Sequence, residues 1–181
     1  MKLHLRTEVS KYISYLLRHN PEDLDMDNYG FVDIGELRRK VMRRYTIDRR
    51  FIYEIVEKSE RKRFEIVGNR IRALYGHTIN IMQNLAEDKA VEVLYHGTTS
   101  DSAKKILKEG IMPMKRMFVH LSPTVEIARE VGLRRTLEPT ILLIDAKTAI
   151  RSGVHFYKVT DKVYLCGYLP PKYIRTVMCD F

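Results

Sequence analysis

Apolar residues near the start of the chain recur at helical spacing and are followed by a polar turn. Over residues 8–18, Val9, Ile13 and Leu16 fall on one face of a helix, which predicts an amphipathic helix. Pro21 lies just beyond this stretch, and the residue before a proline is disfavoured in helical geometry. We therefore expect the helix to end before the proline.

The next segments predict two further helices and a hairpin. Asp33 is followed three residues later by Glu, a capping box that predicts a helix reaching about residue 44. A third helix is expected from 48 to 59. The string "RFEIVGNRIRAL" alternates in polarity on both sides of Gly68-Asn69, which indicates a β-hairpin. Three helices followed by a basic hairpin are typical of a winged-helix domain.

The pattern changes near residue 90. Residues 79–85 are weakly helical, and "AEDKA" (86–90) is typical of a linker. We therefore expect two domains, 1–86 and 87–181.

The second half is predicted to be mainly β-structure with short helices. Strands are expected at 91–98, 116–122, 140–145, 155–159 and 162–166. Helices are expected at 101–109, ended by Gly110 in the left-handed cap position, and at 123–132, ended by Gly132. The fold class is therefore α+β.

Charge favours an anionic partner. The 181 residues carry a net charge of +9 with a pI near 9.5, as in proteins that bind nucleic acid or phosphorylated ligands. Eleven Lys or Arg and four Asp or Glu lie between Arg38 and Arg63, interleaved with aromatic residues. This cluster predicts phosphate or RNA contact, with a solvated basic face as the alternative.

Several classes are disfavoured. Cys166 and Cys179 lack paired spacing, which argues against a zinc site or a disulfide framework and fits a reducing cytoplasm. The first 15 residues lack the apolar run of a signal peptide, and no segment reaches membrane-spanning length. We expect a soluble cytoplasmic protein.

Two groups of residues are candidates for chemistry. Arg18 and His19 close the first predicted helix, where they suit either a helix cap or a phosphate. His96 and His120 each end a predicted strand and are followed within two residues by a hydroxyl, which favours a shared ligand pocket over two separate structural histidines. No carboxylate or Cys lies at ligand spacing beside either one, so a metal site is not expected.

Seven strings along the chain resemble, in order and spacing, the NAD-dependent RNA 2′-phosphotransferases of the KptA family. They are "YLLRHNP", "KRFEI", "IRALYGHT", "LYHGTT", "VHLS", "VGLRR" and "FYKVTDKVYL". The similarity extends over nearly the whole chain. It implies an N-terminal winged-helix lobe and a C-terminal lobe of the ADP-ribosyltransferase fold.

The resemblance also implies a reaction. The internal 2′-phosphate left in RNA, typically at a tRNA splice junction, attacks the ribose of NAD and expels nicotinamide. The ADP-ribosylated RNA is then resolved to 2′-hydroxyl RNA and ADP-ribose 1″,2″-cyclic phosphate. The implied protein is a monomer that uses NAD as co-substrate and needs no metal. Because the attacking phosphate is already anionic, arginines suit the site and a carboxylate would repel it.

Site residues follow from the same resemblance. The catalytic residues matched are Arg18, His19, Arg63 and Arg134. The NAD-binding residues matched are Tyr95, His96, Gly97, Thr98, His120, Ser122 and Val163. Val163 matches the position at which protein ADP-ribosyltransferases carry a catalytic Glu.

The chain departs from the family at two places. Leu74-Tyr75 replace Asn-Gln, and Arg135-Thr136 replace His-Gly, which concerns polar contacts near the phosphate and the loop beside Arg134. Two other functions stay open. One is ADP-ribosyl transfer to a terminal phosphate of nucleic acid, and the other is a winged-helix binding protein without catalysis.

Overall fold

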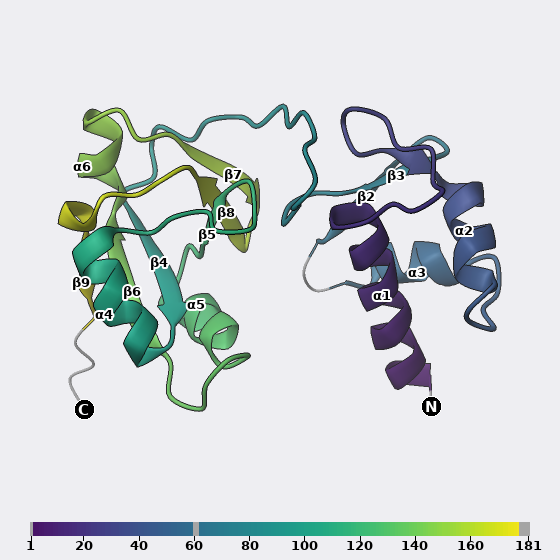
Figure 1. Cartoon of the computed structure of the whole chain (residues 1–181), viewed down its shortest axis with the longest axis horizontal. Helices are drawn as coiled ribbons and strands as arrows, with labels where there is room; N and C mark the ends of the chain where they lie inside the picture. Colours follow the sequence, from purple (N-terminus) through teal and green to yellow (C-terminus); the bar gives the residue numbers. More distant parts are fainter. Residues whose placement is uncertain (1, 60–61, 178–181) are drawn as a thin grey trace. The chain divides into compact units, whose positions relative to one another are not determined.

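The computed structural model describes residues 2–59 and 62–177, with side chains from His4 onward. The chain divides into two compact units, Met1–Asn84 and Leu85–Phe181, and each is described by itself (Figure 1). Cys179 and the part of the basic cluster at residues 60 and 61 lie outside the described residues. The functional division into 1–86 and 87–181 stays a prediction.

The first unit combines helices with one small sheet. Its elements are α1 (Lys2–Arg18), β1 (Val32–Asp33), α2 (Ile34–Met42), α3 (Phe51–Glu57), β2 (Phe64–Val67) and β3 (Arg70–Ala73). The strands form an antiparallel sheet in the order β1-β3-β2. The three helices and the hairpin predicted from the sequence are confirmed, whereas β1 was not expected.

Polar side chains set where these helices begin. The Asp33 carboxylate accepts a hydrogen bond from the backbone N–H of Glu36 at 2.8 Å, which confirms the predicted cap of α2. Asp48 instead accepts from the N–H of Arg50 at 2.8 Å. Because this forms an Asx turn rather than a helix cap, α3 begins at Phe51 and not at 48 as expected.

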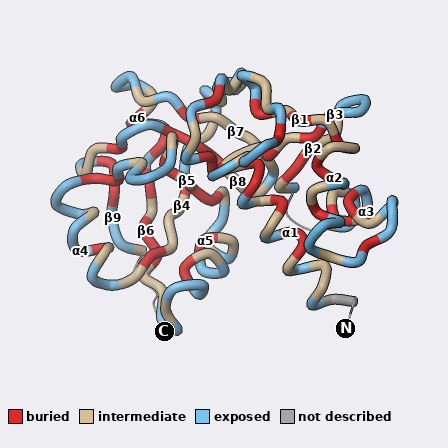
Figure 2. The backbone as a smooth tube through the Cα atoms, turned by 45° about the vertical axis from the view of Figure 1, so that its right-hand side comes forward, coloured by how far each residue is buried: buried red, intermediate tan, exposed pale blue. Residues whose placement is uncertain are grey.

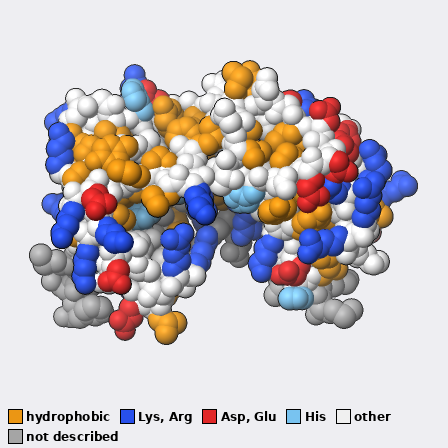
Figure 3. All heavy atoms as spheres, viewed as in Figure 1, with side chains coloured by type: hydrophobic (Ala, Val, Ile, Leu, Met, Phe, Trp, Pro, Cys, Tyr) orange, Lys and Arg blue, Asp and Glu red, His pale blue; other side chains and the backbone are white. Residues whose placement is uncertain are grey.

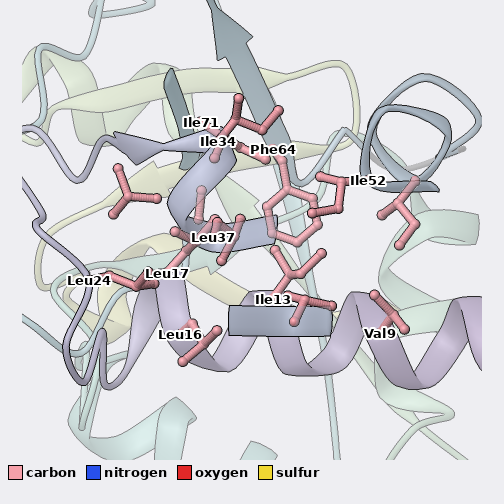
Figure 4. Close-up of a cluster of buried hydrophobic side chains, with 14 of the residues drawn as sticks. Val9, Ile13, Leu16, Leu17, Leu24, Ile34, Leu37, Ile52, Phe64 and Ile71 are labelled. Carbon is pink, nitrogen blue, oxygen red and sulfur yellow. The ribbon is translucent and has the colours of Figure 1, made fainter. Parts of the chain in front are cut away.

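The core of the first unit is built on the apolar face of α1 (Figure 4). Residues from every element bury their side chains there. The largest with under 2% exposure are Ile13, Leu16, Leu17, Leu37, Ile52 and Ile71. Burying each such side chain stabilises the fold by about 1.5–3 kcal/mol.

The weak helix expected at 79–85 is wrong. The segment runs without helical hydrogen bonds, and the N–H of Met82 donates to the carbonyl of Asn28 at 2.7 Å. Ile81 is buried, and its side chain lies over Gly30, which has a φ of +79°. A tertiary contact with the turn at Gly30 therefore replaces the local helix.

The second unit contains two small antiparallel sheets with helices. Its strands are β4 (Val93–Thr98), β5 (Val119–Leu121), β6 (Thr140–Asp145), β7 (Phe156–Thr160), β8 (Val163–Cys166) and β9 (Ile174–Thr176). Its helices are α4 (Ser100–Glu109), α5 (Val125–Gly132), α6 (Ala146–Arg151) and the 3₁₀ turn η1 (Pro171–Tyr173). The sheet orders are β4-β6-β9 and β5-β8-β7. Helices and antiparallel sheets together confirm the α+β class.

A pair of backbone hydrogen bonds joins the two sheets of this unit. The N–H of Tyr95 in β4 donates to the carbonyl of Ser122, and the N–H of Ser122 donates to the carbonyl of Tyr95, both at 2.8 Å. Ser122 directly follows β5. The bridge therefore fixes β4 beside the end of β5, where much of the backbone is buried (Figure 2).

Two glycines expected to end helices have different roles. Gly110 is the C-cap of α4 with a φ of +83°, which confirms that the helix ends at this glycine, but its ψ of −177° is extended rather than that of the expected left-handed helical cap, a conformation that only glycine adopts readily. Gly132 is instead the last residue of α5, and the C-cap is Leu133 with a φ of −57°. A Cβ at position 132 would lie 2.4 Å from the Cβ of Pro139, so this glycine is required by close packing.

Helix α5 packs directly on β4. A Cβ added to Gly97 would lie 1.8 Å from the carbonyl oxygen of Ala128 and 2.7 Å from its carbonyl carbon. Both atoms belong to the helix backbone, which has no flexible end that can move aside. Gly97 is therefore required for the contact between α5 and β4.

We expect Gly97→Ala to lower the free energy of unfolding of the second unit by at least about 3 kcal/mol, the upper range for an overpacked site. Gly167→Ala is the matched control, because a Cβ there has no atom within 4 Å and should cost less than about 0.5 kcal/mol. Urea unfolding of the full-length variants measures both. Equal midpoints for the two would contradict the packing at Gly97.

Candidate active site

The C-terminal end of α1 holds Arg18 in a fixed position. Its guanidinium lies over the rings of Tyr75 and Phe64, 4.9 and 5.8 Å from their centroids. Its Nη2 also approaches the carbonyl oxygen of Arg63 at 3.5 Å. Aromatic faces stabilise a guanidinium by cation–π attraction. Tyr75, one of the two residues that depart from the family pattern, thus provides a face for Arg18.

His19 follows Arg18 and is oriented by a residue that the sequence did not single out. Its Nδ1 lies 3.0 Å from the Thr78 hydroxyl, and that hydroxyl donates to the carbonyl of Arg18 at 3.4 Å. The Thr78 hydroxyl thus contacts both the His19 ring and the Arg18 carbonyl. The N–H of Thr78 also donates to the Arg18 carbonyl, at 2.9 Å. Thr78 therefore links both predicted site residues.

Arg63, just before β2, completes this cluster. Its Nη1 donates to the hydroxyl of Ser10 at 3.4 Å, and Ser10 lies on α1 and is 8% exposed. The carbonyl of Arg63 is the acceptor that Arg18 approaches. Three of the four predicted catalytic residues are therefore brought together in the first unit, around the end of α1.

A groove of about 590 Å³ lies along this cluster. It is lined by α1, by the end of α3 and by Arg63. Its basic lining residues are Arg6, Lys11, His19, Lys58 and Arg63. Its hydroxyl-bearing lining residues are Thr7, Ser10, Ser14, Tyr15 and Ser59. None of the lining residues within the described ranges is acidic, so the groove suits an anion.

His77 is a buried histidine close to these cations. It is 1% exposed, and its Nδ1 lies 2.9 Å from Nε2 of Gln83. Burial, together with the positive charges of Arg18, His19 and Arg72, lowers the pKa of His77 to about 4. The imidazole is therefore neutral at pH 7, and it adds no charge beside Arg18.

In the second unit, two histidines form a chain of hydrogen bonds to the backbone. Nδ1 of His96 lies 3.1 Å from the carbonyl of His120, and Nδ1 of His120 lies 3.1 Å from the carbonyl of Phe118. A carbonyl can only accept, so both Nδ1 atoms carry the hydrogen. Burial lowers the pKa of His96, as does the positive charge of Arg135. His96 is therefore neutral, with Nε2 as an acceptor.

Other predicted NAD-binding residues surround this chain. Thr98 and Ser122 are each 5% exposed, and Tyr95 is bridged to Ser122. Val163 begins β8, one residue before the partner of Leu121 in β5, and so lies at the same end of the sheet as Ser122. The structure thus brings these strand residues together. Gly97 is close to them, but the face on which it lacks a side chain is covered by α5 and is not open to a ligand.

Arg134 lies in the turn after α5. It is exposed, and its backbone N–H donates to the carbonyl of Val131 at 3.4 Å. It belongs to the second unit, so the described contacts do not join it to Arg18, His19 and Arg63. Its neighbour Arg135 is the arginine whose charge acts on His96.

Within residues 2–59 and 62–177, no group of three or more His, Cys, Asp or Glu is arranged to hold a metal ion. No described helix is both long and apolar enough to cross a bilayer. The thiol of Cys166 is buried, which raises its pKa to about 12. A buried thiol of this kind is unreactive.

Comparison with known proteins identifies relatives along nearly the whole chain. A family model described as "RNA 2′-phosphotransferase, Tpt1 / KptA family" matches residues 4–168. The chain is 41% identical over 176 residues to a "Probable RNA 2′-phosphotransferase" of Pyrococcus furiosus, covering 96% of each chain. It is 40% identical over 178 residues to the protein of the same name from Lacticaseibacillus paracasei, covering 96% of this chain and 95% of the relative.

The environment of His77 predicts a pH dependence of stability. The unfolded chain binds a proton near pH 6.5, whereas the folded imidazole does so only near pH 4. Protons therefore favour the unfolded state between these values, and stability is full above pH 6.5 and falls toward pH 4. The loss from this group is about 3 kcal/mol.

We expect His77→Gln to remove this part of the pH dependence, because a Gln side chain can accept from Gln83 and does not titrate. Urea unfolding of the wild type and the variant at pH 7, 6, 5 and 4 measures the difference. Parallel curves of unfolding free energy against pH would show that His77 is not held neutral.

Proposed function

Because the chain belongs to the RNA 2′-phosphotransferase family of Tpt1 and KptA, and is therefore a transferase, we propose that it moves the internal 2′-phosphate of RNA to NAD. The products are 2′-hydroxyl RNA, nicotinamide and ADP-ribose 1″,2″-cyclic phosphate. The observation that carries the proposal is the cluster of Arg18, His19 and Arg63 beside a groove with no acidic lining residue among those described.

In this proposal, each of the two units binds a different substrate. Residues 1–86 form a winged-helix lobe that binds the RNA phosphate, a proposal supported by three helices followed by the β2–β3 hairpin. Residues 87–181 form an ADP-ribosyltransferase-like lobe that binds NAD, supported by the two small antiparallel sheets and the buried polar residues on them.

In the first proposed step, an oxygen of the 2′-phosphate attacks C1″ of the nicotinamide ribose. The bond to nicotinamide breaks, and its electron pair neutralises the positive ring. The nucleophile is already an anion, so it needs positioning more than a base. Arg18 and Arg63 hold it with several N–H donors each. Nδ1 of His19 is engaged by the Thr78 hydroxyl, so its contact with the phosphate falls to Nε2.

In the second proposed step, the ribose 2″-hydroxyl attacks the phosphorus atom. The bond to the RNA 2′-oxygen breaks, and the proton lost by the attacking hydroxyl balances the one gained by the RNA hydroxyl. Negative charge builds on the non-bridging oxygens as the new bond forms. Arginines fixed by stacking and hydrogen bonds stabilise that charge without moving. Arg134 supplies a further cation from the second lobe.

The residues on β4, β5 and β8 suit NAD chemically. Neutral His96 offers Nε2 as an acceptor for a ribose hydroxyl and places no positive charge near the cationic nicotinamide ring. Thr98, Ser122, His120 and Tyr95 provide further polar groups around it. Val163 contributes no charge, and a carboxylate at that position would repel the incoming phosphate.

The decisive test supplies NAD and a short RNA bearing one internal 2′-phosphate, and follows nicotinamide, phosphate position and ADP-ribose products. We expect turnover only with NAD, and turnover that persists in a metal chelator. RNA with a 2′-hydroxyl is the negative control. A 5′-phosphorylated RNA lacking the 2′-phosphate tests terminal ADP-ribosylation. Transfer to that end alone would replace the proposed function.

Loss of a cationic side chain of the first unit should slow the second step more than the first. We expect Arg63→Ala and His19→Ala to accumulate ADP-ribosylated RNA, because one lost donor to a developing oxyanion costs about 10²–10³ in rate. Arg63→Lys should recover only part of the rate, since Lys keeps the charge and loses the forked geometry.

A time course that separates substrate, intermediate and product measures this effect. Purified intermediate given to each variant isolates the second step. If it is converted at the wild-type rate while the first step is slow, the assignment of these residues is wrong.

A further inference from the structure

The groove beside the phosphate cluster continues along the outer face of α1. Thr7, Lys11 and Tyr15 are spaced by four residues and line it, so they lie in one row on the helix surface. His19 lies thirteen positions after Arg6, which corresponds to about 20 Å at the rise of an α-helix. This is several times the ~3.4 Å spacing of nucleotides along a strand, so the groove is longer than one phosphate requires.

Two lysines of the groove, which lie away from the cluster of Arg18, His19 and Arg63, are held only by exposed ion pairs. Lys11 pairs with Glu8 at 3.0 Å and Lys58 pairs with Glu54 at 3.1 Å, with lysine side chains 70% and 60% exposed. Exposed pairs of this kind contribute little to stability. Both ammonium groups can therefore turn to a ligand phosphate without a large loss.

Arg6 is positioned more firmly. Its Nη2 donates to the carbonyl of Glu54 at 3.3 Å, which ties the side chain from α1 to α3. The guanidinium keeps its full charge, because a carbonyl does not neutralise it. Hydroxyls lie beside these cations, and hydroxyl and guanidinium groups are the usual partners of phosphate and sugar oxygens in nucleic-acid complexes.

The basic residues on α2 are in a different situation. Lys40 forms ion pairs with Glu22 and Asp23, and Arg43 lies 3.7 Å from Asp23. The Lys40 side chain is only 10% exposed. In Figure 3, acidic and basic side chains are interspersed on the first unit. Part of the basic cluster predicted to contact RNA is therefore neutralised by the protein itself.

We propose that the groove along α1 binds the ribose-phosphate backbone of the RNA strand that flanks the 2′-phosphate. Lys11 and Lys58 contact backbone phosphates, and Arg6 and Ser14 contact phosphate or sugar oxygens. The inference rests on the proposed function and adds where the rest of the RNA lies. It predicts that substrates long enough to fill the groove bind more tightly than a dinucleotide.

The test compares a 2′-phosphorylated dinucleotide with 2′-phosphorylated octanucleotides extended only on the 5′ side or only on the 3′ side. The variant is Lys11→Ala/Lys58→Ala. Lys11→Arg/Lys58→Arg keeps the charge, and Lys105→Ala/Lys108→Ala removes two exposed lysines of α4 that do not line the groove. The KM for each RNA is measured with saturating NAD at several salt concentrations.

We expect wild-type enzyme to have a lower KM for at least one octanucleotide than for the dinucleotide. The alanine variant should lose most of this advantage. The ratio of its KM for the dinucleotide to its KM for that octanucleotide should be about tenfold smaller than in the wild type. Loss of two single-strand phosphate contacts should also reduce the slope of log KM against log salt by about 1.4. The arginine variant and the Lys105/Lys108 variant should keep the wild-type ratio and slope.

Three results would overturn the inference. They are equal KM values for all three RNAs with wild-type enzyme, an unchanged ratio in the Lys11/Lys58 variant, or an equal loss in the Lys105/Lys108 variant. Each leaves the proposed function intact, because the dinucleotide is still converted. Failure of the proposed function would appear as no NAD-dependent conversion of any 2′-phosphorylated RNA. Anisotropy of a labelled 2′-hydroxyl octanucleotide measures groove binding without catalysis.

Discussion

Burial of the apolar face of α1 is the interaction on which the first unit depends. The same helix that carries Val9, Ile13 and Leu16 into the core ends at Arg18 and His19. Its opposite face lines the groove. Because a helix is rigid over this length, packing on one side fixes the direction of the side chains on the other. The position of the proposed catalytic cations is thus a consequence of core packing.

In the second unit, backbone hydrogen bonds position the candidate site residues. The Tyr95–Ser122 bridge joins two sheets that are each too small to enclose a pocket alone. The carbonyls of His120 and Phe118, at the edge of this junction, then orient His96 and His120. Backbone acceptors fix which ring nitrogen carries the hydrogen. The polar character of the candidate NAD site is therefore set by main-chain geometry as much as by residue type.

Local patterns predicted most of the elements, because caps and turns act over a few residues. The Asp33 cap, the turn at Gly68-Asn69 and the Gly110 cap are of this kind. The predicted strand 140–145 coincides with β6. Short β9 was missed, since it is defined by pairing with β6 from far along the chain.

Contacts between distant residues could not be read from the sequence. Residues 79–85 do not form the expected helix, and the N–H of Met82 instead donates to the carbonyl of Asn28. Thr78 beside His19 and Ser10 beside Arg63 are partners separated by more than fifty positions. Positions at the ends of predicted elements indicated Arg18, His19, His96 and His120, whereas the other candidate site residues follow from the family resemblance alone. All of their roles stay predictions.

The contact of α5 with Gly97 has a consequence for synthesis of the chain. Residues 1–84 contain every element of the first unit, so that unit can form as soon as its last segment has left the ribosome. Strand β4 of the second unit cannot form its native contacts as soon as it leaves the ribosome. Helix α5 covers the face of β4 at Gly97, and β6 forms the backbone hydrogen bonds with β4. Both α5 and β6 are synthesised after β4. The segment carrying the candidate NAD motif therefore stays unpaired during synthesis until α5 and β6 have been made.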